Sequence, residues 1–331
     1  MEDRKKDHIN LAFESQINAK DIDQRFYYEP MLSAHPVNAI PETDFLGKKM
    51  MLPIWVSSMT GGTKLAGTIN RNLARASREF GLGMGLGSCR ILLQDEKYFH
   101  DFDMRDIIGP DYPLWANLGI NQIEDMLLHK QVDRIIELVE KLRADGLFIH
   151  VNPFQEWFQP EGDRLTKPPL ESVQALLEQV KFPVIVKEVG QGMGYESLRQ
   201  LLKLPLGGIE FAAFGGTNFA MVELMRSTPA EQEMFEPLAK IGHDALQMLS
   251  MVNHIVENEP GEIRVKKLIV SGGVRSYLDG YYLINKSKIP AVYGQASTFL
   301  KYARNDYETL RQFIQFQAKG LDLAYAFLRV K

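Results

Sequence analysis

Four polar side chains able to bind ligands and move protons follow one short apolar segment. The run Leu147–Val151 contains His150, and Asn152, Gln155 and Glu156 come directly after it. These residues supply an imidazole, two amides and a carboxylate within seven positions. A (β/α)₈ barrel builds its site from groups at the carboxyl ends of its strands. The segment is therefore the first candidate for a catalytic strand end.

Seven further apolar runs also end in glycine or polar residues. Each ending alone is weak evidence, because glycine after a strand is usually turn geometry. Several such endings that converge on one mouth are harder to explain as turns. The seven endings are Ser57–Gly62, Gly87–Arg90, Asn117–Gly119, Lys187–Glu188, Gly215–Thr217, Ser271–Gly273 and Gly294–Ala296.

The last two endings fit a phosphate site. Ser271-Gly-Gly-Val-Arg275 follows the seventh run, and Gly294-Gln-Ala296 follows the eighth. In barrel enzymes, backbone N–H groups of the seventh and eighth loops and a short helix N-terminus often hold a phosphate. The alternative is two tight turns, but finding both at these two positions favours phosphate binding.

Three single residues have two interpretations each. Lys187 ends the fifth run, where it is either a surface lysine or a cation in the mouth; a cation so close to a strand end normally finds a polar partner. Thr217 is either a ligand-binding hydroxyl or a helix N-cap. Cys89 is either a nucleophile or a small buried hydrophobe, and the absence of an assignable base favours the second interpretation.

The basic stretch Arg4-Lys5-Lys6-Asp7-His8 near the N-terminus is also open to two interpretations. Composition alone indicates a solvated tail, the usual fate of a short charge run. The alternative is a flexible arm that closes over an anionic ligand.

The elements that must position these groups alternate along the chain. The apolar runs are short and continuous, which is typical of parallel strands covered on both faces. They are Met51–Val56, Leu82–Leu86, Leu114–Leu118, Leu147–Val151, Val184–Val186, Gly208–Ala212, Lys267–Val270 and Ala291–Tyr293. Helical periodicity occupies the intervening segments. The expected helices are Lys64–Phe80 with Gly81 as C-cap, Val132–Ala144, Leu170–Val180, Glu196–Leu202, Ala230–Glu257 and Tyr307–Val330.

Eight strand–helix alternations predict one parallel (β/α)₈ TIM barrel over residues 51–331, with an N-terminal extension over residues 1–50. An open doubly wound sheet is the competing architecture. The count of eight and the final helix, which could close the ring, favour the barrel.

Bulk properties exclude several classes of protein. The chain has 331 residues, 45% hydrophobic and 24% charged, as in an ordinary globular enzyme. A net charge of -4 gives no reason to expect nucleic acid or an anionic membrane as partner. No apolar run is long enough to span a membrane, and no signal peptide is recognised. The single cysteine excludes an internal disulfide, and a cytoplasmic location is expected.

In these motifs the chain resembles the type 2, FMN-dependent isopentenyl-diphosphate isomerases. The combination of His150-x-Asn-Pro-x-Gln-Glu156 with Pro160-Glu-Gly-Asp163 is specific to that family, whereas the glycine and lysine elements occur in other FMN barrels. The further matching elements are Arg4-Lys5-x-x-His8-Ile9, Met59-Thr-Gly-Gly62, Gly87-Ser88-x-Arg90, Ala116-Asn-Leu-Gly119, Val186-Lys-Glu-Val-Gly190, Gly215-Gly-Thr217 and Ser271-Gly-Gly273.

The resemblance implies a barrel that forms a homotetramer or larger, uses reduced FMN, Mg²⁺ and NADPH as reductant, and converts isopentenyl diphosphate to dimethylallyl diphosphate. It implies FMN contacts from Met59, Thr60, Ser88, Asn117, Lys187 and Thr217, with Gly272, Gly273, Arg275, Gln295 and Ala296 at the FMN phosphate. It implies substrate contacts from Arg4, Lys5, His8, Ser88, Arg90, His150, Asn152 and Gln155, and a Mg²⁺ contact from Glu156. It thereby reverses the tail interpretation of residues 4–8.

Side-chain acids protonate an unactivated alkene poorly, so a flavin would explain an isomerisation without net redox change. Gln155 is then expected to orient the alkene or a relay water, and His150 to bind diphosphate or tune the relay.

Three departures from the family stand out: Cys89 replaces glutamine, Asn218-Phe219 replaces a small polar residue and Trp, and Tyr281–Tyr293 lacks an alanine-rich helix. The alternatives are an FMN-dependent hydroxy-acid oxidase or dehydrogenase, a non-catalytic flavin-binding barrel, and a flavin-free sugar-phosphate barrel.

Overall fold

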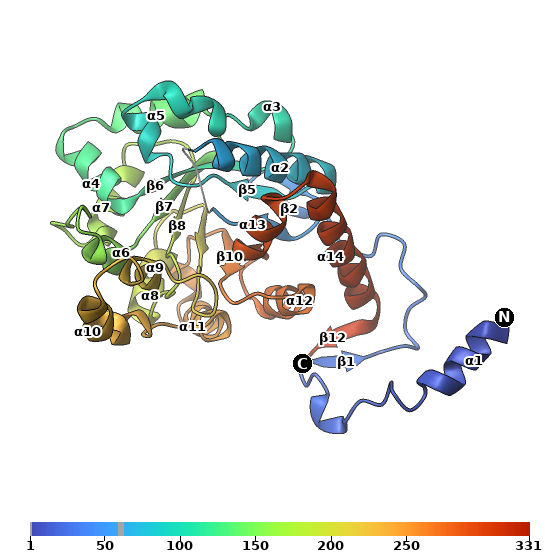
Figure 1. Cartoon of the computed structure of the whole chain (residues 1–331). Coiled ribbons are helices and arrows are strands. Elements are labelled where there is room, and N and C mark those ends of the chain that lie inside the picture. Colours follow the sequence, from blue (N-terminus) through green and yellow to red (C-terminus); the bar gives the residue numbers. More distant parts are fainter. Residues whose placement is uncertain (1, 59–62) are drawn as a thin grey trace.

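The eight predicted apolar runs form one closed parallel barrel. The computed structural model describes residues 2–58 and 63–331. Its strands pair in the order β10-β11-β4-β5-β6-β7-β8-β9, with every pairing parallel. Figure 1 shows the whole chain, with several of these strands labelled. The strands are β4 Ile54–Val56, β5 Gly83–Gly85, β6 Leu114–Gly119, β7 Gly146–His150, β8 Val184–Lys187, β9 Gly208–Glu210, β10 Lys267–Ser271 and β11 Ala291–Gln295. The predicted barrel is confirmed, and the open sheet is excluded.

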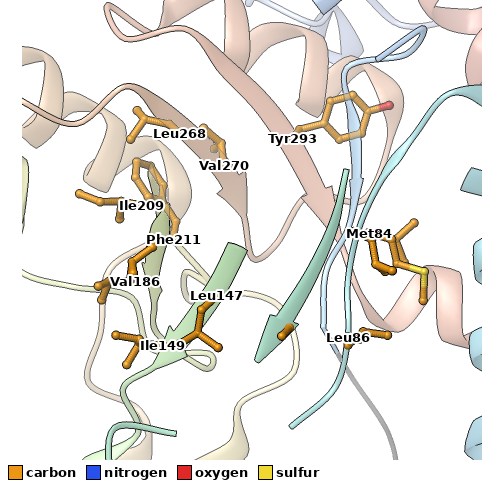
Figure 2. Close-up of a cluster of buried hydrophobic side chains, with 14 of the residues drawn as sticks. Met84, Leu86, Leu147, Ile149, Val186, Ile209, Phe211, Leu268, Val270 and Tyr293 are labelled. Carbon is orange, nitrogen blue, oxygen red and sulfur yellow. The ribbon is translucent and has the colours of Figure 1, made fainter. Parts of the chain in front are cut away.

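Helices surround the barrel because each strand turns alternate apolar side chains outward. Figure 2 shows this outer layer, in which Met84, Leu147 and Ile209 are among the buried side chains. The long helices are α2 Lys64–Phe80, α4 Ile120–Leu128, α5 Val132–Lys141, α7 Pro169–Leu177, α8 Tyr195–Leu202, α10 Pro229–Ala239, α11 Ala245–Asn258, α12 Tyr277–Lys286 and α14 Tyr307–Phe327. Shorter helices are α3 Arg105–Ile108, α6 Pro153–Phe158, α9 Phe219–Leu224 and α13 Ser297–Ala303.

Helix α2 follows its sequence signals from end to end. Thr63 caps its start by accepting a hydrogen bond from the Ala66 N–H. Gly81 ends it in the left-handed conformation, with φ at 63° and its N–H on the Ser77 carbonyl. The predicted C-cap is thus confirmed, since glycine adopts this conformation without steric cost.

The barrel interior is filled by large apolar side chains and closed at the amino-terminal end of the strands. The hairpin of β2 Thr43–Phe45 and β3 Lys48–Met50 carries two of these side chains, Phe45 and Met50. Asp44 of this hairpin lies 3.4 Å from Lys267, the first residue of β10. The other interior side chains are Trp55, Trp115, Phe148, Ile185, Ile269 and Val292. Of the two ends of the barrel, the carboxyl-terminal mouth is the one that this hairpin leaves open.

Two helix predictions were wrong in their extent. Residues 230–257 form two helices, α10 and α11, because Asp244 starts a new helix through a capping box with Gln247. His243 just before it is held by its N–H on the Gln191 carbonyl. The final helix α14 ends at Phe327, and Leu328–Val330 forms strand β12, which pairs antiparallel with β1 Phe26–Tyr28.

The N-terminal extension begins with a helix, α1 Glu2–Leu11, which lies apart from the barrel (Figure 1). The chain returns to the barrel through β1, whose partner β12 follows α14. Within the described ranges, no helix combines the length and apolar character needed to cross a membrane.

Candidate active site

One position at the carboxyl end of each barrel strand faces the mouth. Side chains two positions apart on a strand share a face, so the residue two positions beyond each interior residue also faces inward. The eight inward positions at the mouth are Ser57, Gly85, Asn117, His150, Lys187, Glu210, Ser271 and Gly294. These residues form a ring of mostly polar groups above an apolar interior.

His150 and Lys187 are neighbours in this ring. They are paired residues of the parallel strands β7 and β8. The imidazole Nδ1 of His150 lies 2.9 Å from Oδ1 of Asn117 on the other adjacent strand. The candidate catalytic residue His150 and the predicted flavin lysine Lys187 therefore share one rim, as the sequence predicts.

The protonation of His150 follows from its surroundings. Burial, and then the positive charges of Lys187 and Arg90, lower its pKa from 6.5 to about 3, so the ring is neutral at physiological pH. The amide N–H of Asn117 donates to the Leu86 carbonyl, which leaves its oxygen to accept from Nδ1–H of His150. Nε2 is then an acceptor. This tautomer favours tuning of a proton relay over donation to a phosphate.

The Asn152 side chain and the short helix α6 position the remaining candidate side chains, Gln155 and Glu156. The Asn152 amide donates to Oε1 of both Gln155 and Glu156, at 3.0 Å each. Glu156 also accepts the Asp163 N–H at 3.1 Å, which ties the Pro160–Asp163 stretch to the site. A cavity of about 250 Å³ is lined by Ser88, Arg90, Ile91, Gln122, His150, Asn152, Gln155, Glu156 and Gln159.

Glu223 is a site residue that the sequence analysis missed. It lies in α9 with its side chain buried, and its Oε1 accepts from Gln155 Nε2 at 3.3 Å and from Gln159 Nε2 at 2.9 Å. Arg226 contacts the same carboxylate at 3.2 Å. No strand-end pattern marks Glu223, because it reaches Gln155 from a helix above the mouth.

The predicted metal contact has a sparse donor set. Among the residues the structure describes, no group of three or more His, Cys, Asp or Glu side chains could hold an ion. Glu156 offers one carboxylate, and the neighbouring Asn152 Oδ1 is buried without a hydrogen-bond partner in the described part of the chain. This set fits Mg²⁺, which takes one or two protein carboxylates and fills its shell with phosphate oxygens and waters.

A second cavity, of about 360 Å³, lies over the ends of β8 to β11 and β4. Lys187 lines it, with its ammonium 2.8 Å from the Glu188 carbonyl oxygen. The other predicted cofactor residues that line it are Thr217, Gly272, Gly273, Arg275, Gln295 and Ala296. Glu210, Ser297 and Thr298 line it as well, although no sequence pattern marks them as site residues.

The glycines of the seventh loop bring bare backbone to this cavity. Gly272 has φ at +91°, and a Cβ there would lie 2.1 Å from the Ala213 carbonyl oxygen. Gly273 also has a positive φ, +70°. Only glycine fits such a close approach. Together with the volume, which falls in the range of ligand pockets, this cradle fits a flat phosphate-bearing cofactor.

The structure refines the predictions for two cofactor residues, Gln295 and Thr217. The side chain of Gln295 is held in a buried network, donating to the Val274 carbonyl and accepting from Gln317 Nε2. Only the backbone of Gln295 is therefore free to meet a phosphate. Thr217 is not the helix N-cap considered from sequence, because Asn218 caps α9 by accepting the Met221 N–H.

Cys89 is confirmed as a buried structural residue. It has no exposed surface, and burial raises the pKa of its thiol to about 12. A thiol that stays protonated is not a nucleophile. The neighbouring side chains Ser88 and Arg90 are exposed and line the smaller cavity.

Some predicted residues are not brought to the mouth. Arg4, Lys5 and His8 are exposed on α1, and this helix lies apart from the barrel (Figure 1). Their approach to a ligand stays a prediction that needs movement of the arm. Met59 and Thr60 lie outside the described residues.

Solved structures share the fold. A mandelate oxidase variant with a monooxide FMN adduct has a TM-score of 0.56 at 18% identity, over 93% of this chain and 88% of that chain. A flavocytochrome b2 double variant with sulfite bound has a TM-score of 0.61 at 16% identity, over 90% and 70% of the two chains. At this identity the similarity supports the barrel fold alone.

Curated relatives identify the family, although no family model matches the chain. An isopentenyl-diphosphate delta-isomerase from Rickettsia felis is 34% identical over 331 residues, covering 97% of this chain and 91% of the relative. The protein of the same name from Rickettsia typhi is 32% identical over 306 residues, covering 91% and 86%. The resemblance seen in the sequence motifs is thus confirmed over nearly the whole chain: this protein belongs to the isopentenyl-diphosphate delta-isomerase family.

Proposed function

We propose that this protein converts isopentenyl diphosphate to dimethylallyl diphosphate by a 1,3-allylic proton shift that depends on reduced FMN and Mg²⁺. The observation that carries the proposal is the pairing of His150 with Lys187 on adjacent strands. His150 lines the smaller, polar cavity, and Lys187 lines the larger, glycine-lined cavity. A substrate in one cavity would therefore touch a cofactor in the other.

The larger cavity is the proposed FMN site. Gly272, Gly273 and Arg275 would hold the phosphate through backbone N–H groups and one guanidinium, and Lys187 would lie beside the ring. When bound, reduced FMN supplies an electron-rich ring that can give and take back a proton without net redox change. The FMN-bearing oxidase of the same fold gives this assignment a precedent.

The smaller cavity is the proposed substrate site. Arg90 would bind the diphosphate, and Glu156 would hold Mg²⁺ together with diphosphate oxygens. Arg4, Lys5 and His8 would add positive charge when the N-terminal arm closes.

Gln155 is the proposed positioning group for the alkene or a relay water. Asn152 donates to its oxygen and Glu223 accepts from its nitrogen, so both ends of the amide are fixed. His150, neutral and accepting at Nε2, would tune the relay. These residues bind and orient, which matches the weak acidity of their side chains.

The test is an isomerase assay on the purified protein with isopentenyl diphosphate, with and without FMN, Mg²⁺ and a reductant such as NADPH. We expect dimethylallyl diphosphate only when FMN is present and reduced. Oxidation of a 2-hydroxy acid would instead favour the oxidase alternative. Tightly bound flavin with neither activity would favour a non-catalytic flavin protein, and the absence of any flavin band would favour a sugar-phosphate barrel.

A further inference from the structure

Glu210 is a buried carboxylate at the floor of the larger cavity, and the reaction outlined above gives it no role. It ends β9, has no exposed surface and lines the cavity. Its Oε1 accepts two hydroxyl hydrogen bonds, from Ser57 at 2.5 Å and from Ser271 at 3.0 Å. Its Oε2 has no hydrogen-bond partner within residues 2–58 and 63–331. A buried carboxylate oxygen left this way is costly unless something donates to it.

The surrounding strands are built to accommodate this cluster. Ser271 is on β10, next to β9, while Ser57 follows β4, on the far side of β11. The intervening inward position on β11 is Gly294, where a Cβ would lie 2.6 Å from the Ser57 hydroxyl and 2.8 Å from Cβ of Ser271. The missing side chain at Gly294 leaves room for the contact between Ser57 and Glu210.

Glu210 also lies next to a positively charged side chain. It pairs in register with Lys187 of β8, so a cation and a carboxylate stand side by side in the ring. His150, on the other side of Lys187, has an imidazole, which does not carry a negative charge. The other inward positions are Ser57, Gly85, Asn117, Ser271 and Gly294, none of which ionises at neutral pH. Glu210 is thus the carboxylate among the inward positions that can offset Lys187. Glu188 also interacts with Lys187, but its carboxylate already accepts the backbone N–H groups of Gly190, Gln191 and Gly192.

We propose that Glu210 is a positioning residue that balances the charge of Lys187 at the proposed FMN site. This inference rests on the proposed function, because it takes FMN as the occupant. A lysine alone would stabilise negative charge on the reduced ring. With Glu210 beside Lys187, that stabilisation would be weakened, and a reduced ring bound there would keep its proton more readily.

The test is the midpoint potential of bound FMN in the wild-type protein and in Glu210→Gln. The amide keeps the size and an accepting oxygen but removes the charge. We expect reduced FMN to gain at least tenfold in affinity over oxidised FMN, which raises the potential by about 30 mV for a two-electron couple. Ser271→Ala is the matched control, since it removes a hydrogen bond without changing charge, and it should leave the potential near the wild-type value. Glu210→Asp should restore most of the wild-type potential.

Lys187→Met removes the positive charge instead of the negative one. This second test does not require the Glu210 variant to fold. With Glu210 uncompensated, the potential should fall. The inference is overturned if the potential is unmoved in Glu210→Gln or in Lys187→Met, or if Ser271→Ala moves it as far as Glu210→Gln. A wild-type protein that binds no FMN contradicts the proposed function instead, so the two failures are distinguishable.

Discussion

The neutral state of His150 has a consequence for the pH dependence of stability. Its pKa in the folded protein is about 3, against 6.5 for the ordinary value. The unfolded chain therefore binds the proton more tightly, and stability is lost as pH falls from 6.5 towards 3. At about pH 5 the medium lies roughly 1.5 below the ordinary value, which at about 1.36 kcal/mol for each pH unit gives a loss of about 2 kcal/mol. Because His150 is only partly buried, this is an upper figure.

The assay is urea unfolding of the wild-type protein and of His150→Asn at about pH 8 and about pH 5. Taking the difference between the two proteins cancels the titration of the carboxylates they share. We expect the stability advantage of the wild type over the variant to shrink by up to about 2 kcal/mol between the two pH values.

His129→Asn is the matched control, because His129 is exposed and its Nδ1 lies 3.1 Å from Asp125 on the surface. Its removal should change the free energy of unfolding little, because exposed contacts of this kind contribute little. An equal stability difference at both pH values for His150→Asn would refute the reasoning, since it would mean that His150 titrates alike in the folded and unfolded states.

Three other substitutions test the site. Glu156→Gln should raise the Mg²⁺ requirement and lower turnover while FMN stays bound, and unchanged turnover at low Mg²⁺ would remove Glu156 from this role. Gly272→Ala should weaken FMN binding by at least tenfold in a fluorescence titration, because its Cβ would meet the Ala213 carbonyl at 2.1 Å and the positive φ adds about 1 kcal/mol or more; wild-type affinity would show that the loop does not hold the cofactor. Cys89→Ala should keep turnover within about twofold, since the thiol is buried and protonated, whereas loss of activity in a folded variant would restore a chemical role.

The barrel was predictable because its signals are local and repeated. Short continuous apolar runs such as Val184–Val186 mark strands covered on both faces, and all eight lie in the closed sheet. The break between α10 and α11 was not predictable from helical periodicity. It depends on Asp244 and on the tertiary hydrogen bond between His243 and Gln191.

The same contrast between local signals and tertiary contacts applies to the residues of the candidate site. Residues at strand ends, such as Asn117, His150 and Lys187, were found because a parallel barrel gathers all its carboxyl ends at one mouth. Glu223 was missed because a helix delivers it. Glu210 was missed because it reads as one polar residue inside an apolar run, and its meaning depends on Ser57 from a strand more than a hundred and fifty positions away in sequence.

The most direct measurement of the central claim is a crystal structure of the protein with reduced FMN, Mg²⁺ and isopentenyl diphosphate bound. We predict that the flavin phosphate lies at Gly272 and Gly273, the diphosphate near Arg90 and Glu156, and the five-carbon chain against the ring near His150 and Lys187. A diphosphate or a flavin bound away from the carboxyl ends of the strands would contradict this prediction.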